Sequence, residues 1–493
     1  MSYFKKEDVI IFVAVVIALT QGLNSIVDLP LSYMYKDDYQ LKPAQAASLI
    51  GFIIVPWLLK PIWGVLSDNY PIFGYKRKSY AFLLGLLGFA GYLGLGLWSE
   101  SISSGICLLL MISLSFAFQN VIGEALLVES AQRYGSLPGK TEEDKQKQAS
   151  KNVSLFFAFK NFGTIITAYT GGLLLAHIHK RTIFLMASSL PLGAGLVALF
   201  LPENKHSPTS EESHSKSPLP DEETTDLIQG QRSSTIKPSH NSTVEKVVDF
   251  LRQPEIYKPL IFLFFFRITP SASSAMFYFY TNELKFSPEF MGELKLAGSV
   301  AILIGIFIYN RFLTTTPIKK ILMWSSVICV LLGLSQILLI SRANLEWGIP
   351  DKIFCIGDSL VIVVFAEIHS LPILILTCRL CPKNIEGTMY ALFMSIFNFG
   401  NILSTQLGAL LMWILGITEE SFQNLWILIV ISAVCVALPL PWLQGVQFDE
   451  AVKKTRADSQ QSSPAKQSKS DLDDVNGDDD DGLTLDKSHQ KQD

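Results

Sequence analysis

The chain has 493 residues and a formal net charge of −4; 49% of its residues are hydrophobic and 17% are charged. Its mean hydropathy is positive, and the apolar residues come in blocks of about twenty, the length that crosses a bilayer as a helix. This composition excludes a soluble globular protein and predicts an all-α, polytopic membrane protein.

The first apolar block begins after Asp8 and continues past Leu23 without a small-residue cleavage site, so we expect it to remain in the protein as a membrane helix. Similar blocks follow, and we expect about twelve spanning helices in all. The expected helices lie at residues 9–29, 44–66, 79–98, 105–129, 153–176, 182–201, 257–280, 288–309, 318–341, 354–380, 387–415 and 424–445.

A change in composition divides the chain in two. The stretch from Glu203 to about Lys246 is rich in Ser, Thr, Pro, Glu and Lys and has almost no apolar clusters. The expected parts are a six-helix half at 1–202, a flexible cytoplasmic linker at 203–250, a six-helix half at 251–447 and a disordered acidic cytoplasmic tail at 448–493. The tail run DLDDVNGDDDDG lacks the glycine position of an EF-hand loop, so we expect no calcium site there.

Two of the expected helices share a sequence pattern. The 153–176 helix contains KNFGTIITAYTGGLLL, and the 387–415 helix contains FNFGNILSTQLGALLM. Both stretches carry Asn-Phe-Gly, and their later Ile, Gly and Leu-Leu recur at one constant offset. We interpret this as a trace of duplication, which predicts two parallel six-helix repeats with a site where the halves meet.

Basic residues on the connections predict the orientation. The N-terminus and every second connection carry more Lys and Arg than the other side, which places both termini in the cytoplasm. Lys76, Arg77 and Lys78 lie on one of these cytoplasmic connections, where cations face anionic lipid. Plasma and organelle membranes fit this pattern equally well.

Several charged or amide side chains fall inside or at the ends of the expected helices. A charge at the bilayer centre costs about 2.5–3.5 kcal/mol on insertion scales, so each one is expected to face a cavity or a partner. The candidates are Gln21, Asn24 and Asp28, then Asn120, Glu124 and Glu129, then Lys160, Arg267, Asp358 and Glu367. Spacings of three or four residues place the first three on one face of their helix and the next two on one face of another.

Arg267 lies near mid-depth, directly before a Thr-Pro-Ser break. Pro270 removes a backbone donor, so nearby carbonyls and the hydroxyls of Thr269 and Ser271 can face a cavity. A guanidinium suits a carboxylate, which favours an anion-binding role. The alternative is an ion pair with an acid of another helix that only holds the helices together.

The acids allow two roles as well. A buried carboxyl can hold a proton near neutral pH, so Glu124 and Asp358 are candidates for proton carriers. Either of them could instead pair with Arg267. Lys160 is open to anion binding and to ion pairing in the same way.

Motifs for catalysis or metal binding are weak. Cys378 and Cys381 form a Cys-x-x-Cys pair without a second pair or a histidine set, and no nucleophile triad or phosphate loop is present in the sequence. We therefore expect no enzyme activity, no metal, no cofactor and no nucleic-acid partner, and we expect a monomer.

The connection GVLSDNYPIFGYKRK resembles the loop between the second and third helices of the major facilitator superfamily, in which an acid is followed by Gly and basic residues. The resemblance implies that this loop locks the cytoplasmic gate. The implied gating residues are Gly64, Asp68, Gly74, Lys76, Arg77 and Lys78. Charges that only set the topology are the alternative.

The chain resembles the folate-biopterin transporter family of that superfamily in three longer segments. These are VPWLLKPIWGVLSDNYPIFGYKRKSY, RITPSASSAMFYFYTNELKFSPEFMG and LPILILTCRLCPKNIEGTMYALFMSIFNFGNILSTQLGALL. The likeness covers most of both halves but neither the linker nor the tail. It implies secondary active transport of folate- or biopterin-like pterins by alternating access, as a symport with protons.

Carried over by position, the resemblance assigns acids to Glu124 and Glu129 and basic residues to Lys160 and Arg267. The family typically has an acid where this chain has Asn120, so pterin recognition or coupling can differ here. The candidate substrate-binding residues are Gln21, Asn24, Asn120, Glu124, Lys160, Arg267, Thr269 and Ser271. The candidate coupling or ion-pair residues are Asp28, Glu124, Glu129, Asp358 and Glu367.

The chemistry of a pterin fits such a site. A carboxylate can bond the amino-pyrimidinone edge in two places, and Arg267 and Lys160 would neutralise the carboxylates of a folate tail. Phe277, Tyr278 and Tyr280 are candidates for stacking on the ring, with helix packing as the alternative. Another organic anion or an amino-acid-like solute is the alternative substrate. A non-transporting membrane scaffold or sensor is the alternative from another class, and it predicts that the intramembrane charges can be neutralised without loss of activity.

Overall fold

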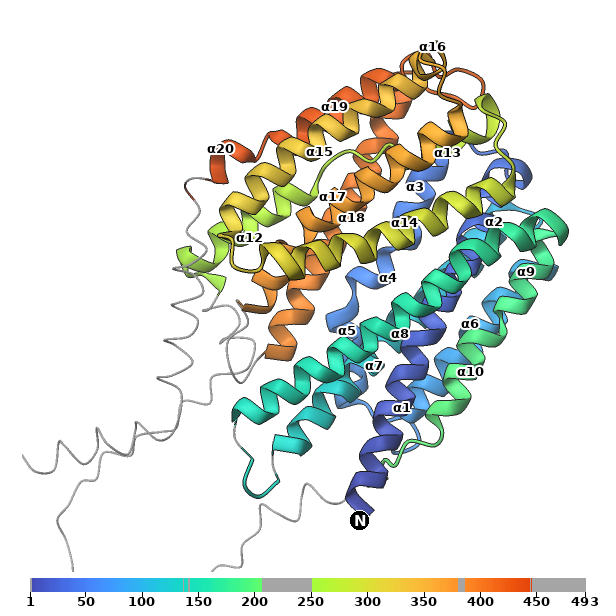
Figure 1. Cartoon of the computed structure of the whole chain (residues 1–493). Coiled ribbons are helices and arrows are strands. Elements are labelled where there is room, and N and C mark those ends of the chain that lie inside the picture. Colours follow the sequence, from blue (N-terminus) through green and yellow to red (C-terminus); the bar gives the residue numbers. More distant parts are fainter. Residues whose placement is uncertain are drawn as a thin grey trace, which may run out of the picture.

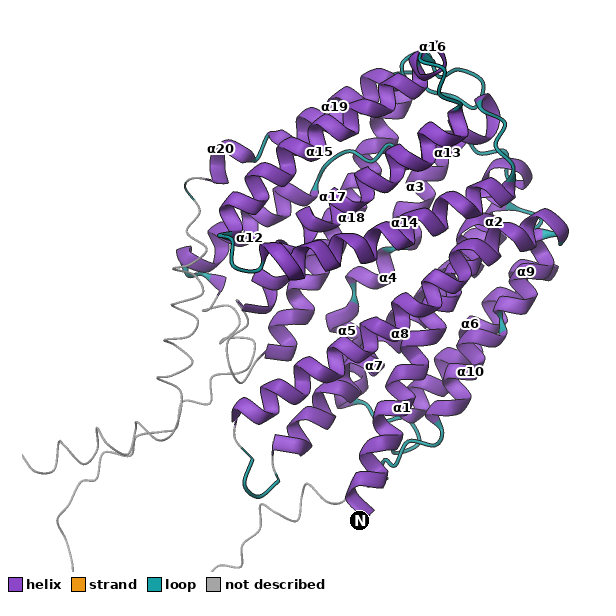
Figure 2. Cartoon of the chain, viewed as in Figure 1, coloured by secondary structure: helices purple, strands orange, loops and turns teal. Residues whose placement is uncertain are grey.

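A computed structural model describes residues 2–135, 137–140, 142–205, 251–379, 386–443 and 445. Within these residues every regular element is helical, and the one pair of extended residues is an isolated bridge between Ile72 and Tyr75 (Figure 2). The all-α prediction is therefore confirmed. The expected tail at 448–493, Cys381 and most of the expected linker lie outside the described residues.

The first group of helices is formed by residues 2–198. Its elements are α1 (Ser2–Leu23), η1 (Asn24–Val27), α2 (Asp28–Tyr33), η2 (Met34–Asp38), α3 (Pro43–Ile53), α4 (Val55–Leu58), α5 (Lys60–Asn69), α6 (Lys78–Leu97), α7 (Ile102–Gly135), α8 (Glu142–His177), α9 (Lys180–Ala187) and α10 (Ser189–Ala198). We call this group the N-terminal bundle. The helix expected at 44–66 is divided into α3, α4 and α5 because Pro56 and Pro61 have no N–H to donate and each begins a new helical turn.

The second group is formed by residues 254–443. Its elements are α12 (Pro254–Arg267), α13 (Ser273–Tyr278), η3 (Phe279–Glu283), α14 (Pro288–Ile308), η4 (Tyr309–Leu313), α15 (Ile318–Ile340), α16 (Ala343–Glu346), α17 (Asp351–Arg379), α18 (Glu386–Ile414), α19 (Leu425–Ala437) and α20 (Leu440–Leu443). We call this group the C-terminal bundle.

Nine helical segments of the described chain are long and apolar enough to cross a membrane. They coincide with nine of the expected helices. The other three expected helices fall on α8, on α12 together with α13, and on α18. The total of twelve spans stays a prediction.

The two bundles meet along two seams (Figure 1). In one seam α8 packs against α14, and in the other α3, α4 and α5 pack against α18. Gly172 and Gly292 make the first seam very close, because a Cβ built on Gly172 would lie 2.6 Å from the Cα of Gly292. Large apolar side chains such as Phe307 and Trp413 are exposed on the outside of the bundles, where lipid would cover them.

Candidate functional site

We call the end of the molecule that carries residues 24–42 and 280–287 the outer end, and the end that carries residues 2–8 and 67–78 the inner end. At the outer end the bundles are joined by polar contacts. Lys295 Nζ lies 2.6 Å from Asp28 Oδ2 and donates to the carbonyl of Ser25 at 2.9 Å. Lys36 Nζ donates to Asn282 Oδ1 at 2.9 Å. Asp28 is thus an ion-pair residue that closes the outer end.

The joined region continues to about the middle of the second seam. Ser48 and Gln406 exchange two hydrogen bonds of 3.0 Å, and Asn398 Nδ2 donates to the carbonyl of Trp57 at 3.1 Å. The polar contacts described between the bundles thus lie at the outer end and in the outer part of the second seam. The molecule is closed at its outer end.

Three charged side chains form a cluster in the N-terminal bundle. Lys60 Nζ lies 3.1 Å from Glu124 Oε1 and 3.3 Å from Glu124 Oε2. Lys60 is only 6% exposed, whereas Glu124 is 33% exposed. Half-buried Lys160 interacts electrostatically with both. Sequence reasoning overlooked Lys60, although a lysine in the middle of an apolar helix was a usable signal.

A pair of amides lies beside this cluster. Asn120 Nδ2 donates to Gln21 Oε1 at 3.0 Å, and both side chains are buried between α7 and α1. Gln21 Nε2 and Asn120 Oδ1 have no partner among the described residues. The pair therefore offers one unused donor group and one unused acceptor. Asn24 lies elsewhere, where its Oδ1 accepts a hydrogen bond from the Tyr92 hydroxyl.

The break after Arg267 is held by neighbouring helices. Ser271 N–H donates to the carbonyl of Ser404 at 3.1 Å, and Ser404 Oγ donates to the carbonyl of Thr269. Ser432 Oγ donates to the carbonyl of Pro270 at 2.8 Å. Hydroxyls of α18 and α19 thus satisfy backbone groups that Pro270 and the end of α12 leave free, as a helix break inside a membrane requires.

Arg267 is solvent-exposed in the structure and interacts electrostatically with Glu367 and with His369. It does not pair with Glu124 or Asp358, which corrects that alternative. Glu124 is bound by Lys60, and Asp358 accepts a hydrogen bond from Ser335. Arg267 is therefore available to an anion, with Glu367 as its only acidic electrostatic partner among the described residues.

A chain of contacts connects the two charged regions. Lys60 Nζ lies 5.5 Å from the centre of the Trp57 ring, and the Trp57 carbonyl accepts the hydrogen bond from Asn398. Two residues further along α18, Gly400 packs against Arg267, since a Cβ built there would lie 3.2 Å from Arg267 Cβ. The Lys60 cluster and Arg267 thus flank the same contact between α4 and α18, below the outer closure.

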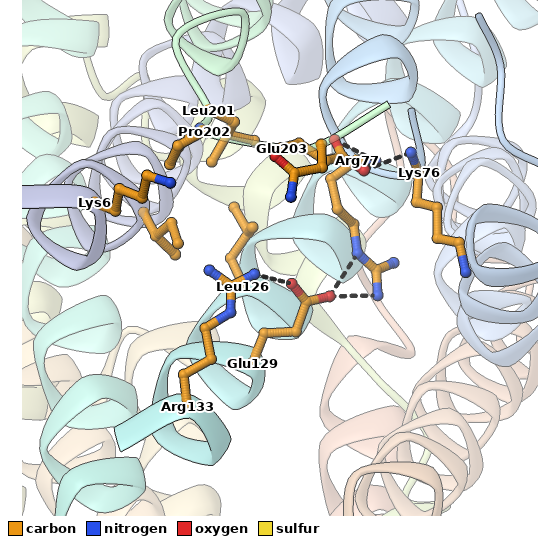
Figure 3. A pocket seen from close by; sticks show the side chains of 11 residues that line it. Lys6, Lys76, Arg77, Leu126, Glu129, Arg133, Leu201, Pro202 and Glu203 are labelled. Carbon is orange, nitrogen blue, oxygen red and sulfur yellow. Dashed lines mark hydrogen bonds and ion pairs between the residues drawn. The ribbon is translucent and has the colours of Figure 1, made fainter. Parts of the chain in front are cut away.

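The predicted gating residues form a network at the inner end (Figure 3). Arg77 lies 2.6 Å from Asp68 and 2.9 Å from Glu129, and Arg133 lies 3.7 Å from Glu129. These side chains belong to α5, α7 and the loop before α6, all in the N-terminal bundle. Several of them line a cavity of about 330 Å³ with Lys6. The loop residues Lys76 and Arg77 thus lie together with Glu129 in the wall of this cavity.

The loop itself is fixed by a residue that the sequence did not single out. The Glu203 carboxylate accepts hydrogen bonds from the backbone N–H groups of Lys76 at 2.6 Å, Arg77 at 3.1 Å and Lys78 at 3.1 Å. A carboxylate is favourable at this position because the N–H groups at the start of α6 are otherwise unpaired. Gly74 adopts a φ of +80° in the same loop, which favours glycine. Gly64 does not take part in the network; it faces Val121 across α7.

The aromatic candidates for stacking lie in the outer closure. Tyr278 is buried and donates to the carbonyl of Leu41. Phe277 packs edge-on against Tyr33 with ring centres 5.4 Å apart. Tyr280 lies against another ring of its own bundle, 5.9 Å from Phe286. In this conformation the three rings take part in packing.

Comparison with known proteins gives a consistent result. A model of the BT1 family matches residues 21–466. The chain is 40% identical over 427 residues to a "Folate-biopterin transporter" of Synechocystis sp., covering 87% of this chain and 79% of the relative. It is 34% identical to "Folate transporter 1" of Plasmodium falciparum, covering 87% and 77% of the two chains.

Solved structures with a similar fold include several transporters. An auto-inhibited POT family peptide transporter superposes with a TM-score of 0.62 at 13% identity, covering 89% of this chain and 96% of that one. The nucleoside transporter NupG superposes with a TM-score of 0.60 at 13% identity, covering 89% and 98%. At this identity the likeness establishes the fold alone, which is the twisted pair of helix bundles described above.

Proposed function

The chain belongs to the BT1 family, and from this membership we propose that it carries a folate- or biopterin-like pterin across a membrane by alternating access. The observation that carries the proposal is the placement of cations from both bundles around one contact. Lys60 and Lys160 lie on the N-terminal side of that contact and Arg267 lies on the C-terminal side. A site shared by two bundles can be exposed to either side of the membrane as they rock.

The substrate class is supported by the chemistry of these groups. Arg267 can form a bidentate pair with a carboxylate of a folate tail, and the lysine cluster supplies a second cationic position. The unused donor of Gln21 and the unused acceptor of Asn120 can each pair with one group of an amino-pyrimidinone edge. Asn120 offers one acceptor and one donor group where a carboxylate offers two acceptors, so recognition of this edge can differ here.

Proton coupling belongs to the same proposal. Glu124 is the acid that forms the ion pair with Lys60, and Glu367 is the acid that interacts electrostatically with Arg267. Either carboxylate can take up a proton when a substrate anion replaces it as the partner of its cation. Asp358, on α17, is hydrogen-bonded to Ser335 and not to Arg267, so it is a weaker candidate for the acid that carries the proton.

The membrane arrangement follows from the orientation predicted by the basic connections. The inner end is assigned to the cytoplasm, together with both termini, and the protein acts as a monomer of two six-helix halves. The conformation described here is then closed toward the extracytoplasmic side. Asp28 and Lys295 belong to the extracytoplasmic gate, and Asp68, Arg77 and Glu129 belong to the cytoplasmic gate.

The test is uptake of labelled folate, biopterin and methotrexate by proteoliposomes, with and without an inward proton gradient. We expect gradient-stimulated uptake of at least one of them by the wild type and a loss of about tenfold or more in Arg267→Ala, since each 1.4 kcal/mol of lost binding is tenfold. Arg311→Ala is the matched control, because Arg311 is an exposed arginine at the end of α14.

Three results would contradict the proposal. Absence of uptake of all three compounds by folded wild type would reject the pterin class and favour another organic anion. Unchanged uptake in Arg267→Ala would reject the site, and unchanged function after neutralising every charge of the site would favour a scaffold or sensor.

A further inference from the structure

The charges of the cluster formed by Lys60, Glu124 and Lys160 do not balance. Two lysines, Lys60 and Lys160, share one carboxylate, that of Glu124. Among the described residues, Lys60 and Glu124 are the charged groups that act on Lys160. With both lysines protonated, the cluster carries a net charge of +1 inside an apolar span, where an unbalanced charge is costly. An additional anion would remove that cost.

The partners of the cluster differ in accessibility. Lys60 is 6% exposed and lies near the Trp57 ring, so its ammonium group is held in place by protein. Glu124 is 33% exposed, so its carboxylate is the part that solvent or a substrate reaches first. The other elements around the cluster contribute neutral groups, Gln21 of α1 and Asn120 of α7. Of the two paired groups, Glu124 is therefore the one that a proton from solvent can reach.

We propose that Lys60 is paired with Glu124 until Glu124 takes up a proton, and that Lys60 then binds a carboxylate of the substrate. The proton binds a Glu124 carboxylate oxygen, the ion pair to Lys60 is lost, and a substrate carboxylate becomes the new partner of Lys60. Loss of the proton re-forms the Lys60–Glu124 pair and expels the carboxylate. This inference rests on the proposed function and identifies the group that couples the proton to the substrate.

The charge balance specifies the substrate class. With Glu124 and both lysines protonated, Lys60 and Lys160 carry +2, which one carboxylate of a dicarboxylate such as the glutamate tail of folate partly neutralises while the other pairs with Arg267. A pterin without carboxylates, such as biopterin, gains nothing from the exchange. The exchange therefore makes proton uptake a condition for tight binding of dicarboxylates and leaves the binding of uncharged pterins less dependent on pH.

The experiment is equilibrium binding of folate and of biopterin to the full-length protein in nanodiscs, at acidic and at neutral pH. Calorimetry in buffers of different ionisation enthalpy counts the protons that are taken up. For the wild type we expect folate affinity to rise on acidification by a factor within the usual range of site coupling, about 5- to 150-fold, with net proton uptake on binding at neutral pH.

Three variants separate the roles. Glu124→Gln imitates the protonated acid, so we expect folate affinity to be high at both pH values and proton uptake to vanish. Lys60→Gln should weaken folate binding by about tenfold or more and weaken biopterin binding less. The double variant Lys60→Gln/Glu124→Gln removes both charges, which avoids an unpaired buried charge if Lys60→Gln alone is unstable. It should bind folate as weakly as Lys60→Gln does.

Several outcomes would overturn the inference. Lys60→Gln or the double variant with wild-type folate affinity would exclude Lys60 as a ligand. Glu124→Gln that loses folate binding as strongly as Lys60→Gln would show that the pair only maintains the structure. Wild type that binds neither folate nor biopterin at either pH would reject the proposed function itself and the inference with it.

Discussion

The outer and inner ends of this molecule use the same kinds of side chain for different purposes. At the outer end Asp28, which is 56% exposed, pairs with Lys295 of the other bundle. At the inner end Arg77, which is 11% exposed, pairs with Asp68 and Glu129 of its own bundle. The Asp28–Lys295 pair thus joins the two bundles, whereas the pairs of Arg77 lie within the N-terminal bundle.

The difference between the two ends affects how much free energy a conformational change costs at each end. Exposed pairs are worth little individually, so the outer closure can open without a large loss. At the inner end the cation Arg77 is more shielded than Lys295, whereas Asp68 is as exposed as Asp28. The inner network also includes a loop fixed by the backbone contacts of Glu203, so it can move as a unit with its bundle. The two ends therefore differ in strength as well as in partners.

The largest expected effect comes from the close seam near the outer end. Gly172→Val places side-chain atoms against the backbone of Gly292 and Pro288, which cannot yield as a side chain would. We expect the outer seam to be forced apart and stability to fall by about 1–3 kcal/mol. The measurement is the distance between spin labels on the outer ends of α9 and α16, together with the unfolding midpoint.

Gly193→Val is the matched control, because nothing lies within 4 Å of a Cβ built on Gly193. It should leave the distance between the bundles unchanged. A wild-type distance distribution in Gly172→Val would show that the seam is loose and would contradict its role in the outer closure.

A smaller effect is expected from the inner network. Arg77→Ala leaves Asp68 and Glu129 without their shared cation, and we expect a loss of about 1–3 kcal/mol of stability, as for other hydrogen bonds to charged groups. Because the network lies within one bundle, the outer distance between spin labels should not change. The measurement compares the unfolding midpoint in detergent with the spin-label distance. A changed distance with unchanged stability would contradict the assignment of this network to the stability of one bundle.

The smallest effect is expected from the exposed outer pair. Asp28→Asn should weaken the closure by about 0.2–1 kcal/mol, because the pair is partly screened by solvent. The shift in the ratio of closed to open molecules is then at most about fivefold. A double-mutant cycle with Lys295→Gln measures the coupling by spin-label distances, and additive effects of the two changes would mean that the pair contributes nothing to closure.

Much of this organisation could be predicted from local sequence. Apolar blocks predicted the helices, and the Gly-Asp-Gly-basic pattern predicted a loop whose charges meet. The Thr-Pro-Ser stretch predicted the break after Arg267, because proline removes a donor wherever the chain goes. These features depend on residues that are close in sequence.

The partners of the charged residues could not be predicted in the same way. Asp28 pairs with Lys295, and Lys60 with Glu124, because packing of distant helices brings them together. Intramembrane charge signals that a partner or cavity exists, but it does not specify which residue supplies it. The positions of the charges were therefore informative, whereas the alternative that Arg267 pairs with Glu124 or Asp358 does not hold.

The central claim is that the binding site is divided between the two bundles. The most direct measurement is the folate affinity of Lys160→Ala and of Arg267→Ala, one cation from each bundle, with Arg311→Ala as the control. We predict that both variants lose about tenfold or more in affinity and that the control does not. Wild-type affinity in either Lys160→Ala or Arg267→Ala would place the site within one bundle and contradict the account.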